Sequence, residues 1–230
     1  MKQLAIALTP IAIILFYIYY KDKYDKEPKK LIFMIMFFGA LACIPAIFLE
    51  VLLEGVFPED APTKIELFLH CLVAVALVEE GLKFIVLRIV TWKNKYFTER
   101  FDGIVYAVSV SLGFAALENI LYVLGNGIGT GIIRAFTAVP MHMVFGIFMG
   151  FYYGKARFSH SSKIVKVFTC LFLPVIFHGL YDFFALAPSR GETWYLWLLV
   201  LLLIVLIIAA LRLVKRESAK KTGIVEPWVE

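Results

Sequence analysis

Seven long apolar segments follow one another along the chain, separated by short polar connections. Each is long enough to cross the hydrocarbon core of a bilayer as a helix, which takes about 20 residues. None alternates between apolar and polar residues as a barrel strand does, and backbone groups in lipid must be hydrogen-bonded internally. We therefore expect helices near residues 3–20, 31–53, 65–90, 104–124, 132–154, 164–186 and 194–214.

The composition agrees with this pattern. The 230 residues are 61% hydrophobic and 18% charged, whereas a soluble domain carries about 25% charged residues. The first segment has no cleavage site of the kind that ends a signal peptide, so we expect it to be retained. The predicted fold is all-α, a polytopic transmembrane helical bundle with one domain over residues 1–214 and a short charged tail over residues 215–230.

Lysine and arginine residues are concentrated in every second connection. The connections 21–30, 91–103 and 155–163 and the tail from residue 215 together hold fifteen, whereas the alternate connections hold three. Because basic residues accumulate on the cytoplasmic side of membrane proteins, the pattern predicts an N-terminus outside the membrane and a C-terminus in the cytoplasm. The net charge of +5 is therefore a topology signal and does not indicate nucleic-acid binding.

Glycines and prolines inside the segments give two further expectations. Glycines at every fourth position of the fifth segment, Gly146, Gly150 and Gly154, predict a face on which two helices pack closely. Pro45, Pro140 and Pro174 lie inside predicted spans, where each removes a backbone donor. Pro140 and Pro174 shortly precede His142 and His178, so they either bend the helices beside these histidines or are ordinary membrane-helix prolines.

Four of the predicted spans carry ionisable residues well inside the membrane. Placing one such group in hydrocarbon costs about 2.5–3.5 kcal/mol on insertion scales. At 1.5 Å of rise per residue, they lie between about 6 Å and about 21 Å below the outer ends of their helices. We therefore expect one polar site in the outer half of the bilayer, built from Glu79, Glu80, Lys83, Glu118, His142, His178 and Asp182.

The spacing within each helix suggests how these residues act. Lys83 follows Glu79 by four residues and Glu80 by three, so we expect a structural counter-ion that partners only one carboxylate well. His178 and Asp182 share one helix face, as an imidazole and its orienting acid would, or as two metal ligands would. A carboxylate in such a site is a candidate general base for activating water. A structural role for one glutamate, and an interhelical hydrogen bond for His142, remain open alternatives.

The motifs together resemble the PrsW family of bacterial intramembrane proteases, which is related to the CAAX-processing and bacteriocin-processing membrane proteases. The resemblance covers roughly residues 9–186 and is specific because several motifs occur in order. They are KYDKEP at 23–28, Glu79-Glu80-x-x-Lys83, Phe114-x-x-x-Glu118 within the segment 101–122, His142-x-x-x-Gly146 and His178-x-x-x-Asp182.

The resemblance implies an intramembrane endopeptidase of the bacterial cytoplasmic membrane. Its expected reaction is the first (site-1) cleavage of a single-pass anti-sigma factor near the outer membrane face, which leads to release of a sigma factor. The expected partners are this substrate and the lipid bilayer, with no nucleic acid. A proton-coupled transporter or channel, and a non-catalytic scaffold that binds substrate helices, are the alternatives. Against a transporter, the sequence shows no paired half-repeats.

The resemblance also implies roles for individual residues. Glu79 activates water, with Glu80 supporting or sharing that role, and His178 positions the water or stabilises the oxyanion. The chain departs from the CAAX group at Glu118, where that group has histidine, and at Asp182, where it often has asparagine. An ionised Asp182 would repel an oxyanion, so His142 is the expected substitute donor. Glu118 and Asp182 would orient the histidines or bind a metal.

A metal site is the open alternative to catalysis by glutamate alone. Glu80, Glu118, His142 and His178 offer nitrogen and oxygen ligands that zinc accepts. The chain has no HExxH motif, which is the usual helix signature of a zinc protease. We therefore favour metal-free glutamate catalysis, which requires no cofactor, and keep Zn²⁺ as the alternative.

Overall fold

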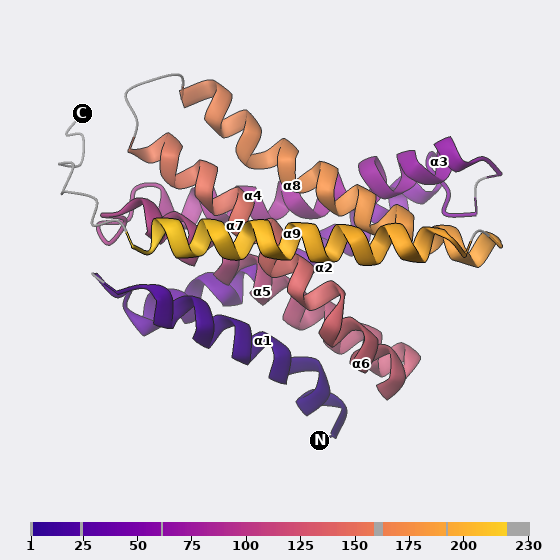
Figure 1. The fold of residues 1–230 in the computed structure, drawn as a ribbon, viewed down its shortest axis with the longest axis horizontal. Coiled ribbons are helices and arrows are strands. Elements are labelled where there is room, and N and C mark those ends of the chain that lie inside the picture. The colour runs from indigo at the N-terminus through magenta and orange to yellow at the C-terminus, as the bar shows by residue number, and fades with distance from the viewer. Residues whose placement is uncertain (1, 24, 61, 159–162, 192, 220–230) are drawn as a thin grey trace.

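The helices predicted from the apolar segments are present in a computed structural model of the chain (Figure 1). The structure describes residues 2–23, 25–60, 62–158, 163–191 and 193–219, and within these ranges it contains no strand. Most of the predicted tail, residues 220–230, lies outside the described residues. The elements are α1 (Lys2–Lys21), α2 (Lys29–Glu54), α3 (Lys64–Leu69), the π-helix η1 (His70–Ala76), α4 (Leu77–Thr91), α5 (Arg100–Asn126), α6 (Ile128–Phe136), α7 (Ala138–Arg157), α8 (Lys163–Leu186), the 3₁₀-helix η2 (Ala187–Arg190) and α9 (Tyr195–Glu217).

Six helical stretches among the described residues are long and apolar enough to cross a membrane. They are α1, α2, α5, α6 together with α7, α8 and α9. The all-α bundle is thus confirmed. The remaining predicted span, near 65–90, is an unbroken helical run made of α3, η1 and α4. Its middle turns have π-helical hydrogen bonding, which often occurs at functional sites.

The predicted span near 132–154 differs from expectation, because it is divided into two helices. The helix is interrupted at Thr137, and α7 begins at Ala138. Pro140 therefore lies in the first turn of α7, where its missing N–H breaks no hydrogen bond within that helix, and the interruption three residues before it agrees with a bend beside His142. Pro45 and Pro174 do lie inside α2 and α8.

The helix α5 forms the centre of the bundle, and it packs most extensively against α7 and α2. Glycines make the close approach to α7 feasible. A Cβ atom on Gly146 would lie 2.9 Å from Cα of Val108, and Gly150 and Gly154 have no room for one against the backbone of Gly103 and Arg100. The predicted glycine face is confirmed as a contact inside the domain, and it fixes the relative position of α5 and α7.

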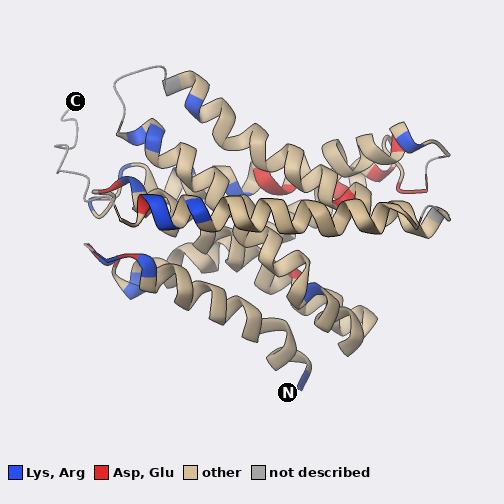
Figure 2. Ribbon diagram, in the orientation of Figure 1, with Lys and Arg blue, Asp and Glu red and all other residues tan. Residues whose placement is uncertain are grey.

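Basic residues gather at one end of the bundle (Figure 2). This is the end where α1 stops, α5 begins, and α7 and α9 stop. The distribution matches the alternation of charge along the chain. The orientation with the N-terminus outside stays a prediction that follows from this charge distribution.

Candidate active site

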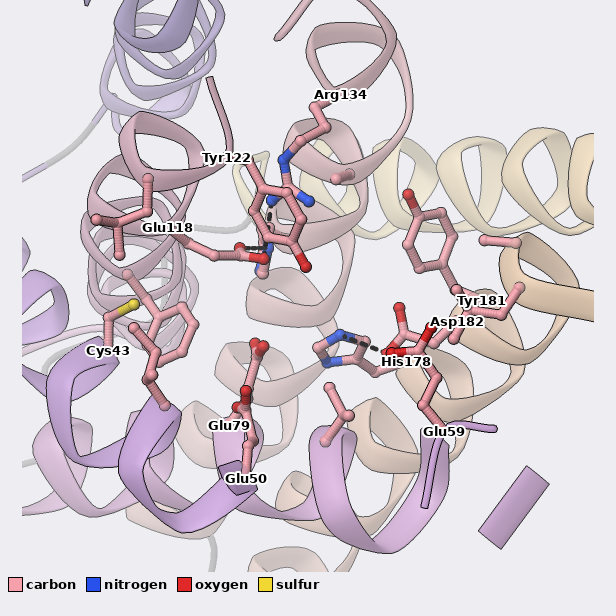
Figure 3. A pocket seen from close by; sticks show the side chains of 18 of the residues that line it. Cys43, Glu50, Glu59, Glu79, Glu118, Tyr122, Arg134, His178, Tyr181 and Asp182 are labelled. Atoms are coloured by element: carbon pink, nitrogen blue, oxygen red, sulfur yellow. Dashed lines mark hydrogen bonds and ion pairs between the residues drawn. The ribbon is translucent and has the colours of Figure 1, made fainter. Parts of the chain in front are cut away.

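A cavity of about 670 Å³ lies between α2, η1, α4, α5, α6, α7 and α8. It reaches the surface at the end of the bundle opposite the basic residues, where the exposed Glu54 and Glu59 form part of its wall. Figure 3 shows carboxylates that point into it from several helices. The six carboxylate residues that line it are Glu50, Glu54, Glu59, Glu79, Glu118 and Asp182.

The helix α4 presents the glutamate pair and Lys83 on one buried face. The Nζ atom of Lys83 lies 2.7 Å from Oε2 of Glu79 and 2.8 Å from Oε1 of Glu80. The expectation that Lys83 partners only one carboxylate well is therefore wrong. Because adjacent carboxylates repel each other strongly in a poorly solvated site, an ammonium that bridges both offsets that repulsion.

Lys83 also reaches a second helix of the site. Its Nζ atom lies 3.2 Å from Nδ1 of His142 on α7 and 4.1 Å from the centre of the Phe114 ring. An ammonium can only donate hydrogen bonds, so Nδ1 of His142 is the acceptor and carries no proton. The proton of the ring is then on Nε2, which donates to Oε2 of Glu118 at 2.8 Å.

His178 stands between two carboxylates. Its Nδ1 lies 3.0 Å from Oε1 of Glu80, and its Nε2 lies 3.3 Å from Oδ2 of Asp182. The ring stacks on Phe145 with centroids 4.7 Å apart. The prediction that Asp182 shares a helix face with His178 is confirmed, and together with Glu80 it fixes the orientation of the imidazole.

The two glutamates of the pair differ in their access to the cavity. Glu79 lines the cavity, whereas Glu80 is completely buried behind it and bonds to Lys83 and His178. A carboxylate that faces the cavity can meet water and substrate there. This arrangement favours Glu79 as the residue that acts on water and gives Glu80 a supporting position.

One group of described residues is arranged to hold a metal ion. Ligand atoms of Glu79, Glu80 and His178 all lie within 4.8 Å of one another. The Oε2 atom of Glu80 is buried and has no hydrogen-bond partner among the described residues, so it is free to act as a ligand. Two carboxylates and one imidazole with an open fourth position suit a catalytic zinc ion. This set fits a metal, whereas Glu118 and His142 of the predicted ligands bond to each other instead.

Several polar residues that line the cavity were not singled out from the sequence, and Glu50 and Arg134 are two of them. Glu50 near the end of α2 is readily explained by interfacial solvation, yet it lines the cavity next to Glu79 (Figure 3). Arg134 on α6 forms an ion pair of 2.9 Å with Glu118. The sequence signal for Arg134 was a lone charge inside an apolar segment, which is costly in lipid and therefore marks a polar partner.

Comparison with known proteins gives consistent matches. The model of the family described as PrsW family intramembrane metalloprotease matches residues 27–211. A protein named Protease PrsW from Geobacillus kaustophilus is 39% identical over 211 residues, which cover 91% of this chain and 89% of the relative. The protein of the same name from Bacillus subtilis is 39% identical over 193 residues, which cover 84% of this chain and 85% of the relative. The one in Clostridioides difficile is 37% identical, with 85% and 82% covered. No solved structure matches the chain.

Proposed function

The chain belongs to the PrsW family of intramembrane proteases, and on that premise we propose that it makes the first cut in a single-pass membrane anti-sigma factor. The cut falls near the outer face of the bacterial cytoplasmic membrane, and later cuts by other proteases release the sigma factor. Membership in a protease family favours this reaction over the transporter and scaffold alternatives.

The observation that carries the proposal is the direction in which the cavity opens. Glu79 faces a cavity that reaches the surface opposite the basic end of the bundle. With the basic end in the cytoplasm, as the charge distribution predicts, the cavity admits an extracytoplasmic segment of a substrate. Water can enter by the same route, which hydrolysis inside a membrane requires.

The residues of the cavity divide the chemistry among them. Glu79 acts as the general base that takes a proton from water. Glu80 holds Lys83 and Nδ1 of His178. The Nε2 atom of His178 lies 3.3 Å from Asp182, and because that carboxylate would repel an oxyanion, we assign this ring atom to positioning the attacking water. His142 acts through Lys83, because both of its ring nitrogens already have partners.

A metal ion would be held by Glu79, Glu80 and His178, the group whose ligand atoms lie within 4.8 Å. Bound there, zinc would supply Lewis-acid activation of water. In that case Lys83 would share the two carboxylates with the ion, and its ammonium would reduce their net charge.

The test is cleavage of a purified, single-pass anti-sigma factor by the chain reconstituted in liposomes. The anti-sigma factor comes from the genome that carries this chain, and the cut is located by mass spectrometry. Wild type and the control Lys93→Gln should cleave on the extracytoplasmic side of the substrate span, because Lys93 is exposed at the basic end, away from the cavity. Glu79→Gln should lose cleavage while retaining its inserted level and melting temperature.

The chelator arm of the same experiment separates the two chemistries. Cleavage that continues in a membrane-permeant zinc chelator supports the glutamate mechanism. Cleavage that stops, and returns when zinc is added, assigns water activation to a metal. A cut on the cytoplasmic side, or full activity of Glu79→Gln, would overturn the proposal.

A further inference from the structure

The short helix α6 brings a cation to the wall of the active-site cavity. Ile132, Ile133 and Phe136 on this helix are exposed at the outer surface of the bundle. Arg134 points the other way, its side chain is 14% exposed, and it lines the cavity. The break at Thr137 turns the chain between α6 and α7, so Arg134 belongs to a different helix from His142.

Arg134 is held at three points on α5. Its Nη2 atom lies 2.9 Å from Oε1 of Glu118, and its Nε donates to Oδ1 of Asn119 at 2.8 Å. The Cζ atom of its guanidinium lies 4.0 Å from the ring centre of Tyr122. Asn119 in turn donates to the carbonyl of Ala7 on α1. A guanidinium fixed by an ion pair, a hydrogen bond and an aromatic ring has one defined orientation.

Glu118 uses its two oxygens for two different partners. Oε1 faces Arg134, and Oε2 accepts the proton on Nε2 of His142. From His142 the contacts continue through Lys83 to Glu79 and Glu80. An unbroken series of polar contacts therefore runs from Arg134 to the proposed base.

We propose that Arg134 is a positioning residue of the peptidase. It holds Glu118 against Nε2 of His142, which leaves Nδ1 of that ring free to accept from Lys83 and so keeps Lys83 on the glutamate pair. The inference rests on the proposed function in taking Glu79 as the base. Arg134 lies on α6, which carries neither the motif of Glu79 and Glu80 nor that of His178. It contacts neither the two glutamates nor His178.

Arg134 supplies the cation that faces Oε1 of Glu118, 2.9 Å away. Without it, that oxygen would lose its ion-pair partner, and the carboxylate could turn away from Nε2 of His142, from which Oε2 now accepts at 2.8 Å. The His142 ring would then lose one of the two hydrogen bonds that orient it, and its Nδ1 would no longer be held 3.2 Å from the ammonium of Lys83. The geometry at the glutamate pair therefore depends on a residue of α6.

A double-mutant cycle separates this role from mere packing of α6. Arg134→Gln should lower kcat by about 10- to 100-fold with little change in KM, as loss of an orienting partner commonly does. Adding Glu118→Gln should cost no further activity, because the charge that Arg134 balances is then gone. The control is Arg212→Gln, which removes an exposed arginine on α9. If the activity losses of the two single variants multiply in the double variant, or if Arg134→Gln raises only KM, the inference is overturned.

A second readout does not depend on cleavage. The chain contains four histidines, so selective ¹⁵N-histidine labelling gives few NMR signals, and those lost in His142→Gln belong to that ring. Wild type should show His142 protonated on Nε2 only, and Arg134→Gln should change these shifts while those of His70 stay in place. Unchanged His142 shifts would overturn the inference whatever the assay shows.

The two readouts keep this inference apart from the proposed function. If wild type cleaves no anti-sigma factor but His142 responds to Arg134→Gln as expected, the inference stands and the substrate assignment fails. Where Arg134→Gln does not insert stably, Arg134→Lys keeps a charge opposite Glu118. It should retain cleavage to within about tenfold of wild type, and a larger loss in a folded Lys variant would contradict the role of charge.

Discussion

The Nζ atom of Lys83 lies 3.2 Å from Nδ1 of His142, and this contact joins two parts of the site that are 59 residues apart in the chain. Lys83 is 1% exposed and also bridges Glu79 and Glu80. Its three donors thus have three acceptors from two helices. Lys83 therefore organises the whole site rather than balancing a single carboxylate.

Replacing Lys83 tests this organising position. Lys83→Met leaves two buried carboxylates without their cation, and breaking a buried ion pair in this way costs about 3–5 kcal/mol. We expect a large fall in the yield of folded protein, measured by size-exclusion chromatography of a fluorescent fusion, together with loss of cleavage.

The double variant Lys83→Met, Glu80→Gln is the matched control for that prediction. Glu79 faces the cavity and can be solvated, whereas Glu80 is fully buried. Removing the charge of Glu80 should therefore restore much of the folded yield without restoring cleavage. Normal yield of the single variant would show that the ammonium contributes little to stability.

His178 gives a second prediction, because two carboxylates orient its ring. In Asp182→Asn the side chain keeps its size but loses its charge next to Nε2, 3.3 Å away in the wild type. We expect kcat to fall by about 10- to 100-fold while the melting temperature changes little, since Asp182 is only partly buried. Activity equal to wild type would remove Asp182 from the site's machinery.

The positions of the buried ionisable residues were the strongest guide that the sequence offered. Charged residues inside apolar runs predicted that Glu79, Glu118, His142 and His178 would meet, and all four line one cavity. The prediction worked because the cost of burying a charge in lipid leaves few alternatives to mutual contact.

The features that escaped prediction depend on local backbone geometry. The π-helical turns before Glu79 and the break at Thr137 have no counterpart in hydrophobic periodicity, which looks the same across both. The lone charge of Arg134 indicated a polar partner, but that this partner is Glu118 depends on the break and could not be foreseen. Solvation near a helix end would account for Glu50 from the sequence alone, and only the packing of α2 against η1 and α4 shows that it faces the cavity.

The glycine contact between α5 and α7 gives a prediction about stability. A Cβ atom added at Gly150 would collide with the backbone of Gly103 and Ile104. Gly150→Ala should therefore force the helices apart, cost about 1–3 kcal/mol, and lower cleavage because Glu118 and His142 are on these two helices. Gly125→Ala, where nothing lies within 4 Å of the added atom, is the control and should leave both the melting temperature and cleavage close to wild type.

A buried acid in the connection between α1 and α2 gives the last prediction, which concerns pH. Glu27 is 2% exposed. Burial, with a smaller contribution from the nearby carboxyl groups of Asp102 and Asp22, raises its pKa from 4.5 to about 9, although the hydroxyl of Tyr106 acts to lower it. The folded chain therefore keeps a proton on Glu27 that the unfolded chain releases above about pH 4.5.

The sign of the effect follows from this difference in bound protons. The contribution of Glu27 to stability is fully present below its unfolded pKa of 4.5 and is lost as pH rises toward about 9. Glu27→Gln, which cannot ionise, should melt at least about 2 °C above wild type at pH 8 and show no such gain at pH 5. Thermal unfolding in detergent at both pH values measures this difference. The control is Asp60→Asn at an exposed position, whose melting temperature should differ from that of wild type by the same amount at both pH values. If the difference between Glu27→Gln and wild type is also the same at both pH values, a buried, protonated Glu27 is contradicted.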